Sequence, residues 1–419
     1  MLGSSSCSHN PDHQPPQNQN QEEVHFQSDP SLQQLQNRHQ IQPSICLRQL
    51  LLACARSISN SDFTAAHRIA TVLSSNSSPH GDSSERVVHF FTKALSLRLR
   101  HLHLPPSPPP PPLCFTDGVL QSSYLTLNQI TPFIRFTQLT ANQAILEAID
   151  QENPDHDIHV LDFDIMHGVQ WPPLMQAISD RRRPPPTLRI TATGTNLDTL
   201  RRTGDRLAKF AHSLGLRFRF FPLLLPNNNS YQTVDDVINH LSAVLLLPNE
   251  ILAVNFVLYL HRLLVDRDKL VMLLRKIKSM NPKVVTLAEK ETNHLNRHPV
   301  FVSRFEEALS YYTAIFESLE VTLPPNSRER MAVEEVWFGR EIEEVVMAEG
   351  EGDEGVLSWE MMMKMSGFGN VALSPFAVSQ AKLLLRLHYP SEGYNLEVVN
   401  DSFVLGWNNQ PLFSVSSWH

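Results

Sequence analysis

Apolar residues recur at helical spacing through the first third of the chain. From Ser44 the apolar positions follow i, i+3, i+4, i+7, i+8 and i+11, at Leu47, Leu50, Leu51, Cys54, Ala55 and Ile58. This period predicts one apolar face of a helix. Ser61-Asp62 is a typical cap for a second helix, and a third is predicted from about Ser84 to Arg100. The proline run at residues 105–112 cannot lie inside a helix, and we expect an exposed polyproline II loop there, with helix resuming at about Asn128.

From Ile158 the pattern changes to short apolar runs that alternate with helical segments. The apolar runs predict strands at residues 159–163, 188–192, 216–221, 251–258 and 284–288. The segments between them predict helices at about 168–181, 196–214, 233–246 and 266–280. This alternation is typical of a parallel, doubly wound sheet that is covered by helices, and we expect the strands to be apolar on both faces.

The last third of the chain predicts a long helix and then antiparallel strands. The apolar face of that helix carries Phe301, Phe305, Ala308, Leu309, Tyr312, Phe316 and Leu319. An acidic, solvated loop is expected at 349–355, and strands are expected at 395–400, 403–407 and 412–416. The predicted fold class is α/β. It has a Rossmann-like, class I methyltransferase-like, mostly parallel sheet core at about 151–419, an N-terminal α-helical cap at about 44–150 and a C-terminal antiparallel hairpin.

Composition limits the compartment and the partners. Residues 1–43 are rich in Gln, Asn, Ser, His and Pro, so we expect a disordered tail there. The net charge of −8 gives no global attraction to nucleic acid or membranes, although a local basic patch stays open. The four cysteines are scattered and form no CxxC pair, which indicates a reducing compartment. No apolar stretch reaches the roughly 20 unbroken residues that span a bilayer, so we expect a soluble protein of the cytosol or nucleus.

The most informative segment is Ile158–Leu174, around the end of the first predicted strand. Asp162 and Asp164 stand where a Rossmann-type sheet binds its ligand. A nucleotide-binding turn needs several glycines at that place, and here only Gly168 follows. The second strand ends in Thr193-Gly194-Thr195-Asn196, without an acid for ribose hydroxyls. We therefore predict no cofactor, and we interpret the two aspartates as groups that cap the next helix or hold a loop.

Motifs for metal binding and nucleophilic catalysis are weak or missing. His101 with His103, and His294 with His298, lack a third ligand at convincing spacing, so no metal site is predicted. The sequence also contains neither a nucleophile elbow nor a P-loop, and no catalytic residue is predicted.

Three further patterns have a structural and a functional interpretation. Arg181-Arg182-Arg183 could serve nuclear import or phosphate contact, but cations at a helix C-terminus are the favoured interpretation. The Leu-x-x-Leu-Leu stretches at 47–51 and 260–264 match co-regulator docking helices, and core packing is favoured for both. Arg340-Glu341 is expected to form a buried or half-buried ion pair with a distant partner.

Several of these segments together resemble the motifs of the plant GRAS family of transcriptional regulators. The residues similar to the VHIID motif are His159, Val160, Leu161, Asp162 and Phe163, continued by Gly168, Gln170, Trp171 and Pro172. The helical regions at about 44–150 and 195–280 stand where the family has its leucine-rich heptad regions. Pro299, residues 301–305, Arg340 and Glu341 resemble the PFYRE region. Residues 337–339, Trp359, Trp407 and Trp418 resemble the SAW region, with Ser417 in place of the alanine.

The resemblance covers about residues 44–419 and implies a protein without established catalysis. It implies action in the nucleus through other transcription factors of the GRAS or zinc-finger type, with homo- or heterodimers, indirect DNA contact and no membrane. The proline-rich run, Leu323–Arg330 and Trp337–Ile342 are most similar to the lateral suppressor branch, which is associated with axillary meristem initiation and shoot branching. The motif residues are assigned structural roles. Two alternatives stay open: an S-adenosylmethionine-type binding protein or methyltransferase, and a direct sequence-specific DNA binder.

Overall fold

The computed structural model describes residues 43–103, 117–153, 155–181, 184–225, 233–264, 266–292, 300–324, 326–348 and 358–419. Several expected features lie outside these residues. They are the tail up to residue 42, the proline run at 105–112, the acidic loop at 349–355 and the histidine pair of His294 and His298.

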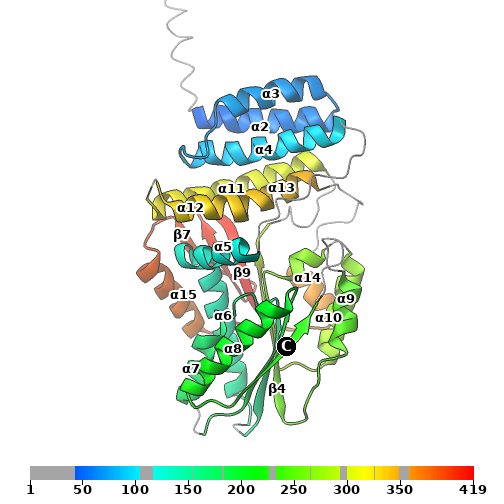
Figure 1. The fold of residues 1–419 in the computed structure, drawn as a ribbon, viewed down its shortest axis with the longest axis vertical. Helices are drawn as coiled ribbons and strands as arrows, with labels where there is room; N and C mark the ends of the chain where they lie inside the picture. Colours follow the sequence, from blue (N-terminus) through cyan, green and yellow to red (C-terminus); the bar gives the residue numbers. More distant parts are fainter. Residues whose placement is uncertain are drawn as a thin grey trace, which may run out of the picture.

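Helices from two distant parts of the chain pack together at one end of the molecule (Figure 1). The first group is α2 (Pro43–Ser59), α3 (Phe63–Ser75) and α4 (Ser83–His103). The second group is α11 (Phe301–Thr322), α12 (Arg328–Val333), the π-helical turn η4 (Glu334–Gly339) and α13 (Arg340–Met347). Phe91 of α4 lies edge-on to Phe305 and Tyr312 of α11, with ring centroids 5.2 and 6.2 Å apart. Both groups therefore share one apolar core, which we call the helical cap.

This packing groups the helices differently from the division expected at residue 150. Helix resumes at Asp117 rather than Asn128, as α5 (Asp117–Ile130) followed by α6 (Pro132–Asp150). The break falls at Thr131 because Pro132 has no N–H to donate and suits the first turn of a new helix. Ile145 and Ile149 of α6 are buried against the sheet. So α6, expected in the cap, covers the sheet, and residues 301–347, expected in the core, complete the cap.

The described strands form one sheet in the order β3-β2-β1-β4-β5-β9-β8-β7, with β6 paired to β9. Their bounds are β1 (Asp157–Phe163), β2 (Leu188–Gly194), β3 (Phe218–Leu224), β4 (Glu250–Val257), β5 (Val284–Lys290), β6 (Asn370–Val371), β7 (Tyr394–Val399), β8 (Ser402–Trp407) and β9 (Gln410–Trp418). Strands β1 to β5 are parallel, and β9 runs antiparallel to both β5 and β8. The predicted α/β fold class is confirmed.

The expected C-terminal antiparallel hairpin is present within a three-stranded antiparallel segment, β7, β8 and β9, which matches the three strands predicted there. Its two connections are Asn400-Asp401 and Asn408-Asn409, and all four residues have positive φ between 45° and 69°. Positive φ at both central residues is the geometry of the two-residue hairpin turn that matches the twist of the strands, and Asn and Asp tolerate it best after Gly. The first turn therefore falls one residue before the expected Asp401-Ser402.

Helices cover both faces of the sheet (Figure 1). One face packs against α6, α7 (Trp171–Arg181) and α8 (Leu197–Ser213). The other packs against α9 (Val234–Leu241), the 3₁₀ turn η2 (Leu260–Leu263), α10 (Arg267–Ser279) and α14 (Trp359–Met365). Helix α15 (Pro375–His388) packs beside α6 and β7. No helix of the described residues combines the length and apolar character needed to cross a membrane.

Two expectations about the sheet and its helices are wrong in detail. Of the five parallel strands, β1, β2, β4 and β5 are buried on both faces, whereas β3 is an edge strand without a fully buried residue, and Phe221 is 46 % exposed. Helix α9 ends at Leu241 rather than 246. Leu245 and Leu246, which extended the prediction, are exposed and therefore add no helical core face.

Candidate functional site

The candidate site lies at the carboxyl ends of β1 and β4, where an open α/β sheet of this order binds ligands. The turn after β1 has positive φ at Asp164 (64°), Met166 (51°) and Gly168 (62°). A left-handed backbone costs a residue other than glycine on the order of 1–2 kcal/mol. Contacts hold the turn: the Asp164 N–H donates to Thr193 Oγ1 at 2.8 Å, and the Asp164 carboxylate pairs with Arg262. Contacts of Asp164 therefore help to hold the left-handed backbone of this turn, in which only one of the three residues with positive φ is a glycine.

Asp162 is buried and joins three parts of the molecule. Its two carboxylate oxygens accept hydrogen bonds from Trp171 Nε1 and from Asn255 Nδ2, each at 2.8 Å. Burial raises the pKa of Asp162 to about 7, against the opposing effect of these two hydrogen bonds. Asp162 thus ties β1 to β4 and to the start of α7. Of the two roles expected for Asp162, these contacts favour holding the turn over capping the helix.

The neighbouring amide side chains bond to one another across the strand ends. Asn255 and Gln170 exchange hydrogen bonds, with both N···O distances at 3.1 Å. Gln170 Nε2 also donates to Asn142 Oδ1 at 3.2 Å, and Thr286 Oγ1 donates to Asn255 Oδ1 at 2.8 Å. Their hydrogen-bonding capacity is used within the protein, which leaves these groups poorly placed to recognise a ligand.

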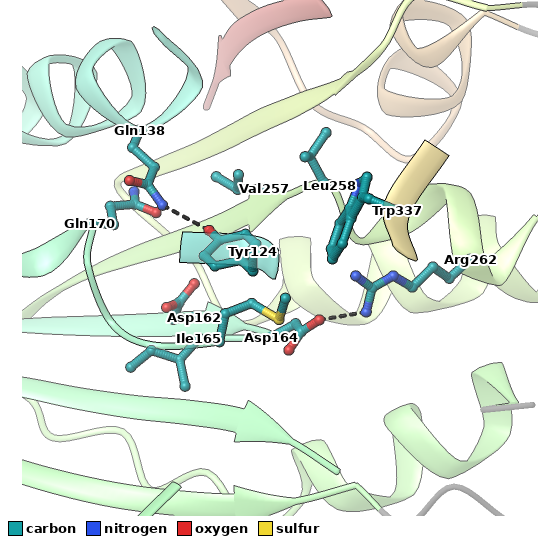
Figure 2. A pocket seen from close by; sticks show the side chains of 11 residues that line it. Tyr124, Gln138, Asp162, Asp164, Ile165, Gln170, Val257, Leu258, Arg262 and Trp337 are labelled. Atoms are coloured by element: carbon teal, nitrogen blue, oxygen red, sulfur yellow. Dashed lines mark hydrogen bonds and ion pairs between the residues drawn. The ribbon is translucent and has the colours of Figure 1, made fainter. Parts of the chain in front are cut away.

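Two aromatic side chains fill the space above these residues (Figure 2). Figure 2 shows Tyr124 of α5 at the centre, with Gln138 and Gln170 on one side and Trp337 and Arg262 on the other. Tyr124 is 5 % exposed, and its hydroxyl accepts from Gln138 Nε2 at 3.2 Å. The cavity that remains beside these side chains has a volume of about 20 Å³. This is room for roughly one water, whereas ligand pockets are usually about 300–1,000 Å³.

The π-helical turn η4 aims Trp337 at this space. The chain is helical without a break from Arg328 to Met347. Within η4 each backbone hydrogen bond spans one residue more than in an α-helix, so the helix is locally wider. Trp337 then lies with its ring centroid 6.0 Å from that of Tyr124, while Phe338 packs on Tyr312 and Phe316 inside the cap. The cap and the sheet therefore meet at the Tyr124–Trp337 pair.

The remaining β1 motif residues lie inside the core. Val160, Leu161 and Phe163 are completely buried. His159 is also buried and lies 2.9 Å from Thr191 Oγ1 and 2.9 Å from Arg189 Nη2. Burial, and then the charge of Arg189, lower the pKa of His159 to about 3, so its ring is neutral at physiological pH.

The motif continues into α7. Trp171 is completely buried at the start of that helix, and Pro172 follows it in the first turn, where a missing N–H is harmless. A Cβ added to Gly168 would lie 2.9 Å from Thr203 Cγ2, so the glycine is required both by its φ and by the approach of α8.

The expectation for Arg340-Glu341 is correct for the glutamate and wrong for the arginine. Glu341 accepts from the distant Lys290 Nζ at 2.5 Å and from Tyr312 OH at 3.1 Å. Arg340 is exposed and pairs with Glu344 of its own helix at 2.9 Å, because adjacent helical residues point in different directions.

The two C-terminal tryptophans are buried and hydrogen-bonded. Trp407 Nε1 donates to Glu317 Oε2 at 3.3 Å, and its ring lies edge-on to Tyr394. Trp418 Nε1 donates to Ser416 Oγ at 2.8 Å, within the strand that pairs with β5.

The other candidate motifs lie in structural positions. Leu260, Leu263 and Leu264 are buried in the core, whereas the first Leu-x-x-Leu-Leu stretch buries only Leu51 fully. Arg181 pairs with Asp150 at 2.8 Å, and Arg182 and Arg183 lie outside the described residues. The described residues contain no group of three or more His, Cys, Asp or Glu that could hold a metal ion.

Sequence reasoning missed Tyr124, Asn255 and Glu289. Glu289 is completely buried at the end of β5 and accepts from the backbone N–H groups of residues 259–261 and from His261 Nδ1. A polar residue inside an apolar strand run was an available signal for Asn255 and Glu289, since such groups need buried partners. Tyr124 gave no signal because its helix was not predicted.

Comparison with known proteins gives consistent matches over most of the chain. Residues 47–419 match the profile of the GRAS domain family. The chain is 47% identical over 409 residues to Scarecrow-like protein 18 of Arabidopsis thaliana, covering 89% of this chain and 91% of that protein. It is 42% identical over 398 residues to Protein MONOCULM 1 of Oryza sativa subsp. japonica, covering 88% of each. The crystal structure of SCL7 in Oryza sativa superposes with a TM-score of 0.72 at 35% identity, covering 89% of this chain and 99% of that one.

Proposed function

Because the chain belongs to the GRAS domain family, we propose that it is a non-enzymatic regulator of transcription that acts in the nucleus through contacts with other proteins. The family is one of transcriptional regulators, and the matched relatives include proteins named Scarecrow, DELLA and MONOCULM 1. The proposed process is axillary meristem initiation and shoot branching, which the similarity to MONOCULM 1 supports.

The observation that carries the non-enzymatic part is the filled space at the strand ends. Tyr124 and Trp337 occupy the place above Asp162 and leave room for roughly one water molecule. The amides at this place bond to one another. A nucleoside would have to displace a buried tyrosine and break these bonds, and both costs oppose binding.

Calorimetry with S-adenosylmethionine tests this part of the proposal. We expect no heat of binding with the full chain up to millimolar ligand. The control variant Leu125→Ala changes an exposed neighbour of Tyr124 on α5, and it should show the same absence of binding heat as the unchanged chain. Binding in the micromolar range that Asp162→Ala abolishes, in a variant with an unchanged circular dichroism spectrum, would contradict the proposal and favour a methyltransferase-type protein.

Three experiments test the regulatory part. A fluorescent fusion of the chain should accumulate in nuclei of plant cells, and tethering the chain to a reporter promoter should change transcription in either direction. A pull-down from shoot meristem tissue should recover transcription factors, of the GRAS or zinc-finger type. Cytoplasmic localisation together with an unchanged reporter would overturn this part.

Direct DNA binding is a second candidate, and one observation favours it. The exposed face of α8 carries Arg201, Arg202 and Lys209, although Asp198 and Asp205 reduce the local positive charge. Binding to a promoter fragment should then weaken steeply with salt and fall further in Arg202→Glu/Lys209→Glu. The double variant binding DNA as tightly as the wild type, or no binding at low salt, would eliminate this candidate.

A further inference from the structure

Helix α15 carries an apolar stripe on the side turned away from the protein. Its inward side buries Ala377, Ala381 and Leu385. On the outward side Phe376 is 56 % exposed, Leu383 52 % and Leu387 63 %. These three residues are spaced i, i+7 and i+11, which places them within about 40° of one another around the helix. Figure 1 shows α15 at the margin of the molecule, beyond α6.

The three side chains together expose on the order of 300 Å², a size at which the largest apolar patch of a monomer is often functional. Apolar anchors at such helical spacing are the feature by which amphipathic helices bind grooves and other helices. The stripe therefore fits an elongated partner such as a second helix.

The charges that α15 itself carries beside the stripe are of one sign, and Glu147 of α6, which accepts from Ser374 Oγ at the N-terminus of the helix, is half-buried. Lys382 and Arg386 are both exposed and lie on the same flank of α15, about 40° apart around the helix. From Pro375 to Ser391 the chain contains no Asp or Glu, although its net charge is −8. Glu392, just beyond this range, is the nearest acidic residue along the chain after the helix. A cationic flank favours a partner with carboxylates at the facing positions.

A second copy of the chain fits this surface less well. A twofold-symmetric, antiparallel pairing of two α15 helices brings the same flank of each helix together. Lys382 and Arg386 of one copy would then face Lys382 and Arg386 of the other, and like charges at an interface are unfavourable. The charge pattern thus selects against self-association through this face.

We propose that the outer face of α15 binds an amphipathic helix of another protein, in which the apolar positions are flanked by carboxylates. This rests on the proposed function, since it identifies a surface and a partner chemistry for a regulator that acts through protein contacts. The apolar stripe supplies the contact area, and Lys382 and Arg386 set the choice of partner.

Two synthetic helical peptides of about 20 residues test the proposal, a length at which a helix is stable enough to be presented. Both carry leucine at the core positions, one with glutamate and one with lysine on the flanks. Fluorescence anisotropy with the full chain should give a Kd at least about ten-fold lower for the glutamate peptide. Leu383→Ser should weaken that binding about ten-fold, and Met272→Ser, at a 57 % exposed site on α10, should leave it unchanged.

The charge pair gives an independent variant if Leu383→Ser is poorly folded by circular dichroism. Lys382→Glu/Arg386→Glu changes only exposed side chains and should reverse the preference between the two peptides. The proposal is overturned by equal binding of both peptides, by an unchanged preference in the charge variant, or by sedimentation that shows a dimer dependent on Leu383. If the peptides fail while the tethered chain still changes reporter transcription, the α15 surface is excluded and the proposed function stands.

Discussion

Replacing Trp171 with phenylalanine tests whether Asp162 holds the turn after β1. The substitution removes the indole N–H that donates to Asp162 Oδ2 at 2.8 Å, in a residue with no exposed surface. A hydrogen bond to a charged group contributes about 1.5–3 kcal/mol, because the group left behind stays buried. The smaller ring leaves a cavity that costs roughly 1–2 kcal/mol more. We therefore expect a loss of about 2.5–5 kcal/mol in the free energy of unfolding at pH 8.

Trp418→Phe is the matched control. Trp418 is equally buried and loses the same part of its ring, but its Nε1 donates to the neutral Ser416 Oγ at 2.8 Å. A neutral hydrogen bond contributes about 0.5–1.5 kcal/mol. The difference between the two variants should therefore be about 1–1.5 kcal/mol, with the effect of the ring removed by subtraction.

The pH dependence of this difference identifies the carboxylate as its source. The folded-state pKa of Asp162 is raised to about 7 from an ordinary value of 3.8. Its contribution to stability is therefore present below pH 4 and lost as the pH rises to 7. Losing a donor raises the folded pKa further, so Trp171→Phe should lose stability more steeply than the control as the pH rises. At pH 5.5, where Asp162 is mostly protonated, the difference between the variants should shrink.

Urea unfolding followed by circular dichroism and by tryptophan fluorescence measures both variants at pH 5.5 and pH 8. Coincident transitions from the two probes establish that a single free energy applies. Equal losses in Trp171→Phe and Trp418→Phe at pH 8, or a difference between them that is larger at pH 5.5, would refute the role given to Asp162.

Three further outcomes are expected. Burial raises the pKa of Glu334 to about 7 from 4.5, so its contribution to stability is lost as the pH rises from 4.5 to 7. In urea unfolding, the free energy of unfolding of Glu334→Gln relative to the wild type should therefore rise by up to about 3 kcal/mol over that range. A relative stability that instead rises toward low pH would contradict this. Gly168→Ala should lower the free energy of unfolding by about 1–3 kcal/mol more than Gly215→Ala does. Both glycines have φ above 60°, but only at Gly168 would the added Cβ meet another side chain, that of Thr203 at 2.9 Å. Equal losses in the two variants would show that strain in φ alone matters. Deleting residues 105–112 should leave the fold intact, and a melting temperature lowered by more than about 8 °C would contradict this.

The sequence predicted the sheet well because its strands are continuous apolar runs. All five parallel strands were predicted, with ends that differ by two residues or fewer at most positions. The antiparallel strands were also predicted, since Asn-rich turns separate them. The helical cap was predicted only in part. Which distant helices share a core depends on three-dimensional packing, and the pairing of α4 with α11 leaves no local trace in either segment.

The candidate site divides in the same way. The holding role proposed for Asp162 follows from the missing glycines, which are a local signal, and its contacts with Trp171 and Asn255 favour that role. Its partner Asn255 could not be found locally, since it is brought near only by the neighbouring positions of β1 and β4. Helix α5 was missed because its residues include many Ser, Gln and Thr, which weaken the apolar period. Without α5, the filling of the space by Tyr124 could not be foreseen.

The position of β9 has a consequence for the timing of biosynthesis. Strand β9 lies between β5 and β8, although β5 ends at Lys290 and β9 begins at Gln410. A ribosome that adds about 5–20 residues per second needs roughly 6–24 s to make the intervening 119 residues. During that interval the nascent parallel half of the sheet has an unpaired apolar edge at β5, which is a template for wrong pairing. Nascent chains of this protein should therefore depend on chaperones at this stage, and a message truncated before Gln410 should yield an aggregating product rather than a stable shorter domain.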